Sequence, residues 1–242
     1  MGYFYQPIVQ PSKSGVQFNA YSRNEKGTLL GLFITFEGPE GAGKTTQIHP
    51  LADFLRSQGW DVLTLREPGG TPISEQVRAV LMNLANTAMH PRTEILLFLA
   101  ARAQLVEEVI RPALADGKIV LCDRYADSTL AYQGYGHGVD LDTLRQLLHF
   151  ATGGLQPDLT FLLDVDPLIG LRRKQKEGEW NRLDACDAQF HQRVRAGYRQ
   201  IAAADPRRWV IVDAAQPPDA VQSLLRQHTL ARLRAQTAPY SG

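Results

Sequence analysis

The sequence lacks the features that mark several classes of protein. It has only two cysteines, Cys122 and Cys186, which lie far apart and do not have the spacing of metal ligands. We therefore favour two reduced thiols over a disulfide. No apolar run approaches the ~18 residues that a membrane span needs, and residues 1–29 have no basic region followed by an apolar one, as a secretory signal would. These absences predict a cytoplasmic protein that does not enter a membrane.

The sequence also lacks an excess of charge of either sign. Its 26 Lys and Arg residues nearly balance its 25 Asp and Glu residues, so the net charge is +1 and gives no indication of a nucleic-acid partner. Its 242 residues, 44% of them hydrophobic, are enough for one substantial core. We expect a single domain over residues 30–236, preceded by a poorly ordered polar extension at 1–29 and followed by a short tail at 237–242.

Apolar runs alternate along the chain with patterns typical of helices. Five runs are almost wholly apolar and are predicted to be strands: 29–37, 60–65, 118–123, 159–165 and 208–214. The helices are predicted at 44–58, 73–84, 91–115, 127–134, 140–152, 167–176, 185–203 and 217–235. This alternation predicts an α/β fold with a five-stranded parallel sheet covered by helices on both faces. Ligands of such sheets bind beyond the carboxyl ends of the strands, which gathers along one rim Glu37, Arg66, Asp123 and Asp164.

The stretch "FEGPEGAGKTTQ" at residues 36–47 contains the spacing G-x-x-x-x-G-K-T of a phosphate loop. An apolar strand precedes it and a helix follows, as the motif requires, whereas a glycine-rich turn with an unrelated lysine would need neither. Lys44 would reach the β- and γ-phosphates of a nucleoside triphosphate, and the Thr45 hydroxyl would ligate Mg²⁺. Because an acid repels phosphate, the loop alone predicts that Glu40 faces solvent. The residues expected to bind the nucleoside triphosphate, which the resemblance given below implies is ATP, are Gly38, Pro39, Glu40, Gly41, Ala42, Gly43, Lys44, Thr45 and Thr46.

Two stretches after the loop have both a simple and a functional interpretation. "REPGGT" at 66–71 follows the second strand, and a proline-glycine turn explains it but leaves Arg66 and Glu67 on the rim unexplained. In "EILLFLAARAQLVEEVI" at 94–110, Phe98 and Arg102 are four residues apart on one helix face, where a ring and a guanidinium could hold a planar base. From the spacing alone, a core phenylalanine beside a surface arginine is the more common arrangement.

The third stretch, "DRYADSTLAYQGYG" at 123–136, follows the third strand. Asp123 is placed like the acid that helps to hold Mg²⁺ in phosphate-loop proteins, and Arg124 would lie beside the transferring phosphoryl group. Ser128, Tyr132 and Gln133 follow at helical spacing. Taken singly, each of these residues could be an ordinary cap or surface residue.

In this order, "FEGPEGAGKTTQ", "REPGGT", "LLFLAAR" and "DRYADSTLAYQG" resemble the thymidylate kinase family in its bacterial form, whose members phosphorylate dTMP with ATP. The resemblance runs from about Leu32 to the last predicted helix. It implies the nucleoside monophosphate kinase type of phosphate-loop fold, Mg²⁺ as cofactor, and a homodimer packed through helices.

The resemblance also implies roles at the matching positions. Phe98 would stack on thymine, and Arg102 and Gln133 would hydrogen-bond its polar edge. Tyr132 would crowd the 2′ position of the sugar, while Glu40 would approach the 3′-hydroxyl. The acceptor phosphate or the transferring group would be surrounded by Arg66, Arg78 and Arg124. The residues expected to bind dTMP are Glu40, Arg66, Pro68, Arg78, Phe98, Arg102, Arg124, Ser128, Tyr132 and Gln133.

The charged stretch "LRRKQKEGEWNRLDA" at 171–185 is predicted to be a lid over ATP, although a solvated surface would have a similar composition. The phosphate loop has no arginine, which in the family goes with a lid that supplies one. Gln175 and Glu177 stand where close bacterial relatives often carry arginine, which leaves open which cation reaches the phosphates. We favour Arg173, with Arg182 and Lys176 as alternatives. The expected catalytic residues are Lys44, Arg124, Arg173 and Arg182.

The predicted reaction is in-line transfer of the γ-phosphoryl group of ATP to the 5′-phosphate of dTMP, giving dTDP and ADP. Two alternatives fit parts of the sequence. One is a kinase of the same fold that acts on another nucleotide or on a nucleoside. The other is a phosphate-loop ATPase switch with a protein or DNA partner, which the near-neutral charge and the base-binding stretches disfavour.

Overall fold

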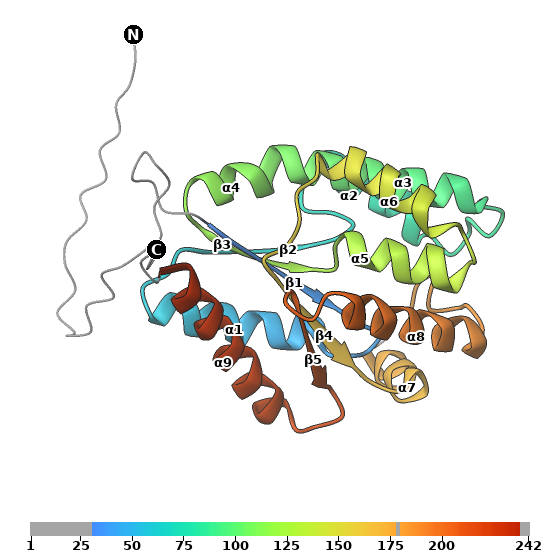
Figure 1. The fold of residues 1–242 in the computed structure, drawn as a ribbon. Coiled ribbons are helices and arrows are strands. Elements are labelled where there is room, and N and C mark those ends of the chain that lie inside the picture. The colour runs from blue at the N-terminus through green and yellow to red at the C-terminus, as the bar shows by residue number, and fades with distance from the viewer. Residues whose placement is uncertain (1–30, 178–179, 238–242) are drawn as a thin grey trace, which may run out of the picture.

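The computed structural model describes residues 31–177 and 180–237. Its strands form one parallel sheet in the order β2-β3-β1-β4-β5 (Figure 1). They are β1 (Leu32–Glu37), β2 (Val62–Arg66), β3 (Ile119–Asp123), β4 (Leu159–Asp164) and β5 (Trp209–Asp213). The predicted fold class is confirmed, whereas the extension predicted at 1–29 lies outside the described residues.

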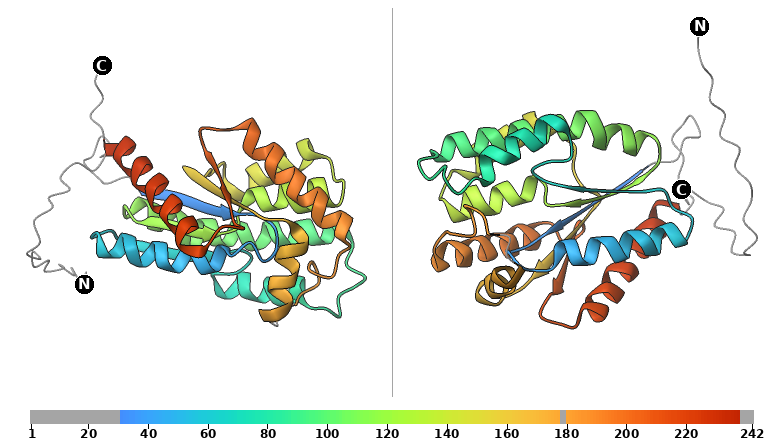
Figure 2. Two further views of the ribbon diagram at one scale, coloured as in Figure 1. Left: turned by 90° about the horizontal axis from the view of Figure 1, so that it is seen from below. Right: turned by 180° about the vertical axis from the view of Figure 1, so that it is seen from behind.

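Helices cover both faces of the sheet (Figure 2). Because side chains alternate along a strand, Ile34 of β1 faces α1 (Lys44–Ser57) and α9 (Pro218–Thr237), while Phe33 faces the opposite side. That opposite side is covered by a continuous run of α3 (Pro91–Leu105), the π-helical segment η1 (Val106–Ile110) and α4 (Arg111–Ala115). The remaining helical elements are α2 (Pro72–Met82), α5 (Ala126–Thr129), η2 (Leu130–Gly136), α6 (Leu141–Thr152), α7 (Pro167–Glu177) and α8 (Ala188–Ala204).

The two π-helical segments were not predicted from the sequence. The helix predicted at 91–115 contains η1, and the helix predicted at 127–134 is divided between α5 and η2. In a π-helix each hydrogen bond spans five residues rather than four, so side chains leave the 3.6-residue period. Tyr132 and Gln133 lie in η2, and the α-helical spacing assumed for them is therefore wrong.

Both cysteines are free thiols in the structure, as predicted. Cys122 is buried in β3, and Cys186 lies just before α8. Within the two described ranges, no helix combines the length and the apolar character that crossing a membrane requires.

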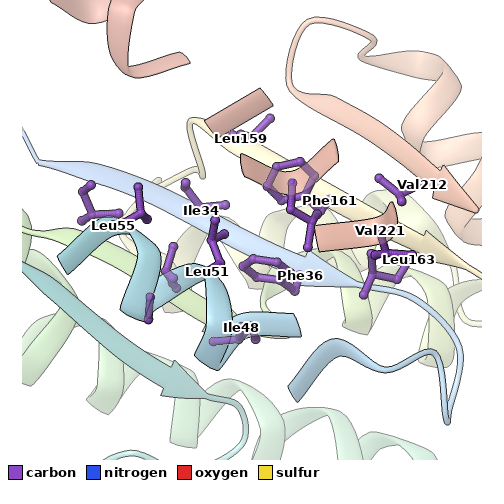
Figure 3. Close-up of a cluster of buried hydrophobic side chains, with 14 of the residues drawn as sticks. Ile34, Phe36, Ile48, Leu51, Leu55, Leu159, Phe161, Leu163, Val212 and Val221 are labelled. Carbon is purple, nitrogen blue, oxygen red and sulfur yellow. The ribbon is translucent and has the colours of Figure 1, made fainter. Parts of the chain in front are cut away.

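A buried hydrophobic cluster fixes the position of the phosphate loop. Ile34 and Phe36 of β1 share this cluster with Ile48 and Leu51 of α1 and with Phe161 of β4 (Figure 3). None of these side chains is more than 3% exposed. The strand that enters the loop and the helix that leaves it are thus held by the same core, which fixes the loop at the carboxyl edge of the sheet.

Helix α7 lies directly against this loop. A Cβ atom on Gly41 would overlap the carbonyl group of Gly170 in α7, and a Cβ atom on Gly170 would overlap the carbonyl oxygen of Glu40. Gly41 also has a φ of 64°, which side-chain-bearing residues rarely adopt. Two glycines therefore allow the backbones of α7 and the loop to meet.

We expect Gly170→Ala to destabilise the fold, because the added methyl group must push α7 away from the carbonyl of Glu40. Such overpacking costs ~1–3 kcal/mol, which lowers the midpoint of thermal unfolding by roughly 2–12 °C in a chain of this length. The matched control is Ile169→Ala, a neighbouring α7 substitution of a side chain that is 42% exposed. Equal melting temperatures for Gly170→Ala and the wild type would contradict the close approach.

Candidate active site

The phosphate-loop residues form a cradle of backbone groups. Gly38, Gly41 and Gly43 have φ angles of 142°, 64° and 81°, which turn the chain tightly before α1 begins at Lys44. No side chain caps the start of α1, so its first amide groups are available to an anion. Lys44 Nζ donates to the carbonyl oxygens of Gly38 (3.2 Å) and Pro39 (3.0 Å), which places the ammonium group inside the cradle.

The two predicted metal ligands lie together beside the cradle. Thr45 Oγ1 donates to Asp123 Oδ2 over 2.7 Å. They meet because β3 pairs with β1, which sets Asp123 opposite Phe36. The described residues include no group of three or more His, Cys, Asp and Glu side chains arranged for a metal ion. Two protein oxygens nevertheless fit Mg²⁺, which usually completes its coordination with water and phosphate oxygens.

A cavity of about 530 Å³ joins the loop to the other predicted stretches. All the residues predicted to bind dTMP line this cavity, as do both predicted metal ligands and the loop from Glu40 to Thr46. The structure therefore brings together segments that lie far apart in the sequence. Four predicted site residues do not line it: Gly38, Pro39, Arg173 and Arg182.

One end of the cavity is formed by buried polar groups. Arg102 is 2% exposed, and its Nε donates to Glu67 Oε2 over 2.7 Å. Further donations run to Thr129 Oγ1 (2.9 Å) and to the Tyr125 carbonyl (3.0 Å). Gln133 Nε2 donates to a buried carboxylate, Glu94, over 2.7 Å. The simple alternative of a surface arginine at position 102 is thus wrong.

Glu67 is a functional candidate that the sequence placed on the rim without assigning it a role. It follows β2, is buried, and pairs with Arg102 through Oε2. Burial raises the pKa of Glu67, while the attraction of Arg102 opposes that rise. Its other oxygen, Oε1, is buried and has no hydrogen-bond partner within the described chain. Because Glu67 lines the cavity, the carboxylate both neutralises Arg102 and retains an acceptor.

The phosphate end of the cavity collects charges around Glu40. Arg124 Nη2 lies 2.7 Å from Glu40 Oε1, and Lys174 Nζ lies 3.0 Å from Glu40 Oε2. The Tyr132 hydroxyl donates to the same carboxylate over 2.9 Å. Burial alone would raise the pKa of Glu40, but Arg124, Lys44 and Lys174 together hold it well below its usual range. The expectation that Glu40 faces solvent is therefore wrong, since its side chain is only 11% exposed.

Two further arginines lie near the rim of the cavity. Arg66 Nη2 lies 3.0 and 3.1 Å from the two carboxylate oxygens of Glu75, and Arg78 Nη1 donates to the carbonyl of Pro68 over 2.9 Å. The peptide bond between Glu67 and Pro68 is cis. Burial, together with the nearby Arg66, lowers the pKa of Arg78. A second concentration of positive charge thus lies beside Arg124.

The cations of the predicted lid have different positions. The alternative candidate Lys176 is exposed and does not line the cavity. Arg173 Nη1 donates to the carbonyl of Ala214 over 3.1 Å, and Arg182 pairs with Glu94. Lys174 lines the cavity and bridges Glu40 and Asp184, and the distance from Lys174 Nζ to Asp184 Oδ1 is 2.8 Å. The sequence offered no signal for choosing Lys174, because the face that α7 turns to the cavity depends on its packing.

Comparisons with known proteins agree with this geometry. The family model described as thymidylate kinase matches residues 36–225. A thymidylate kinase of Roseiflexus sp. (strain RS-1) is 53% identical, covering 79% of this chain and 90% of the relative. A thymidylate kinase of Thermomicrobium roseum is 57% identical over 79% of this chain and 91% of its own length.

A solved structure has the same fold. The crystal structure of thymidylate kinase from Ehrlichia chaffeensis superposes with a TM-score of 0.68 at 35% sequence identity. It covers 82% of this chain and 98% of the solved one. The sequence match and the shared fold together show that the chain belongs to the thymidylate kinase family.

Proposed function

We propose that this protein is a thymidylate kinase, an enzyme that transfers the γ-phosphoryl group of ATP to dTMP and yields dTDP and ADP for dTTP synthesis. The observation that carries this proposal is the cavity that joins the phosphate loop to an end lined by buried polar groups. Family membership supports the same reaction. No observation favours a kinase for another acceptor or an ATPase switch.

The triphosphate of ATP would be held by the loop, through Gly38, Pro39, Glu40, Gly41, Ala42, Gly43, Lys44, Thr45 and Thr46. Lys44 would exchange its two carbonyl contacts for phosphate oxygens. Thr45 and Asp123 would hold Mg²⁺, which neutralises charge on the β- and γ-phosphates when it is bound.

The base of dTMP would lie between Phe98 and the polar groups of Arg102 and Gln133. Tyr132 and Glu40, joined by a 2.9 Å hydrogen bond, would meet the sugar at its 2′ and 3′ positions. Pro68 and Ser128 complete this side of the cavity. A base with the wrong polar edge would leave buried donors unpaired, which is a strong source of discrimination.

The acceptor phosphate would lie among Arg66, Arg78 and Arg124. Its oxygens are largely ionised at neutral pH, so no general base is needed to generate the nucleophile. Catalysis would therefore depend on holding two phosphates in line and on stabilising the charge that spreads during transfer. Lys44 and Arg124 supply positive charge from within the cavity.

The lid would supply a further cation. Arg173 and Arg182 remain candidates, but both hold groups outside the cavity lining. Lys174 is better supported, because its ammonium group already lies against Glu40 at the phosphate end. Phosphate oxygens arriving there would give Lys174 a stronger anionic partner than the carboxylate.

A homodimer is proposed from the surface of three neighbouring helices, and a cytoplasmic location is proposed from the family. α2 packs on α3, and α3 packs on α6. These helices and the turn after α2 carry large apolar side chains that are between 46% and 88% exposed: Ile73, Val80, Leu84, Leu96 and Phe150. An apolar surface spread over packed helices is typical of a subunit interface.

The reaction is tested by an ADP-release assay with ATP and Mg²⁺ over a panel of acceptors. We expect kcat/KM for dTMP to exceed that for dCMP, dAMP and thymidine by at least about 100-fold, because a wrong acceptor leaves buried polar groups unpaired. The preference over dUMP should be smaller, roughly 10-fold, since only one methyl group differs. A protein that binds ATP but forms no dTDP would contradict the proposal.

The lid assignment is tested by comparing Lys174→Met with Arg173→Met. We expect Lys174→Met to lower kcat by about 100-fold, the usual effect of losing one preorganised charge at the reacting group. Arg173→Met should change kcat by less than about 5-fold, because its present partner is the carbonyl of Ala214. A larger loss for Arg173→Met would reverse the assignment, and thermal melts of both variants would exclude unfolding.

The interface is tested by light scattering of Leu96→Asp. Leu96 is 59% exposed on α3, and we expect the charge to yield particles near the 26.9 kDa of one chain, against twice that mass for the wild type. Leu168→Asp is the matched control, because Leu168 is 50% exposed on α7 and lies off this surface. A Leu96→Asp protein that keeps the mass of a dimer would remove α3 from the interface.

A further inference from the structure

A buried carboxylate lies behind the phosphate loop and outside the cavity lining. Glu37 is the last residue of β1 and is 0% exposed. Its Oε1 accepts the Tyr125 backbone N–H at 2.8 Å. Its Oε2 accepts the hydroxyls of Ser128 at 2.6 Å and Tyr198 at 2.9 Å. Strand β1, helix α5 and helix α8 thus meet at one carboxylate.

The partners of Glu37 surround Arg124, whose backbone conformation is unusual. Arg124 has a φ of 68°, and it is the only non-glycine residue with a positive φ in the part of the chain described here. Such a conformation persists only where neighbouring contacts hold it. The Arg124 N–H donates to the carbonyl of Phe36 over 2.9 Å, and the next N–H, of Tyr125, donates to Glu37. Two consecutive β1 residues therefore fix both sides of the turn.

The same carboxylate also sets the direction of two hydroxyl groups. Ser128 and Tyr198 donate to Glu37, and both accept from Arg124 Nη1, at 3.3 and 3.2 Å. A hydroxyl has one hydrogen and two lone pairs. The two hydroxyls also lie 2.8 Å from each other, where either can be the donor. At least one of their two hydrogens therefore points to the carboxylate, and lone pairs are left for the guanidinium. An amide at position 37 would donate to these hydroxyls and turn their hydrogens toward Arg124.

The charges around Glu37 indicate that this carboxylate has a chemical role. Burial and the negative charge of Asp127 raise the pKa of Glu37 to about 7. The hydrogen bond from Ser128 and the attraction of Arg124 lower this pKa but do not cancel the rise. Asp127 is itself neutralised by Arg208 at 2.6 Å. A buried acid with a raised pKa is costly to keep for packing alone and is more typical of a site with a chemical role.

We propose that Glu37 is a positioning residue for phosphoryl transfer, which fixes the Arg124 turn and orients the two hydroxyls that aim its guanidinium into the cavity. The inference rests on the proposed function, because it assigns to Glu37 no contact with either substrate. Glu37 acts only through Arg124, and its effect on turnover must therefore disappear when the Arg124 side chain is absent.

The test is a double-mutant cycle in kcat at saturating ATP and dTMP. We expect Glu37→Gln to lower kcat by at least about 30-fold, while KM for ATP changes by less than about 3-fold, because the loss is confined to charge stabilisation during transfer. In the Arg124→Ala background, the same change should lower kcat by less than about 3-fold. Equal effects in the two backgrounds would overturn the inference.

A matched control separates positioning from loss of a buried charge. Asp127→Asn also removes a buried carboxylate, but its ion pair is with Arg208 and none of its hydrogen bonds reaches Arg124. Its effect on kcat should be the same with and without the Arg124 side chain. If Asp127→Asn showed the dependence on Arg124 expected of Glu37→Gln, the effect would be general and the inference would be wrong.

A second variant decides the matter if Glu37→Gln does not fold. Tyr198→Phe removes one of the two hydroxyls that link Glu37 to Arg124, and we expect a fall in kcat of roughly 5-fold that is absent in the Arg124→Ala background. A fall of equal size in both backgrounds would contradict the inference. A wild-type protein that forms no dTDP would overturn the proposed function itself, whereas an active wild type with independent effects would overturn only the role of Glu37.

Discussion

The arrangement of the site depends on one electrostatic constraint, the balance of charge around Glu40. A cavity that is to receive phosphate groups must contain cations before they arrive, yet cations buried together repel one another and lose hydration. Glu40 resolves this conflict, because Arg124 and Lys174 lie 2.7 and 3.0 Å from its two oxygens. Lys44 is held nearby with its pKa lowered to about 8, chiefly by burial and by Arg124. The carboxylate therefore preassembles the positive charge that a phosphate would otherwise have to gather.

The fold meets this constraint by bringing strand ends together. β1 lies at the centre of the sheet with β3 and β4 on its two sides, so the phosphate loop emerges between the Arg124 turn and the segment that leads into α7. The loop and α7 touch through Gly41 and Gly170, which brings Lys174 within reach of Glu40. A bulkier residue at either glycine would separate two of the charges that have to meet. The close packing of the two backbones is thus required for these charges to meet.

The sequence predicted the sheet well, because a parallel sheet of this kind depends on local patterns. Apolar strands alternate with helices, and the ordered motifs identify the segments that meet at one edge. It failed where the answer depends on contacts between distant segments. The partners of Glu40 are Arg124 and Lys174, which are 84 and 134 residues away along the chain. No spacing argument could show that α7 would turn Lys174, rather than Arg173, toward the cavity. The π-helical turn at Tyr132 escaped because an analysis of helical period assumes 3.6 residues per turn.

The end of the cavity proposed to bind the base differs physically from the end proposed to bind phosphate. Arg102 is buried and neutralised by Glu67, so it offers little net charge to attract a ligand from a distance. A guanidinium has five N–H groups, and the contacts to Glu67, Thr129 and Tyr125 leave donors in reserve. Those donors are out of water, and a base that cannot accept from them leaves them unpaired at a cost of about 1–3 kcal/mol each. In the proposed function, selectivity at this end would therefore arise from the penalty on a wrong base, whereas binding at the other end would arise from attraction between opposite charges.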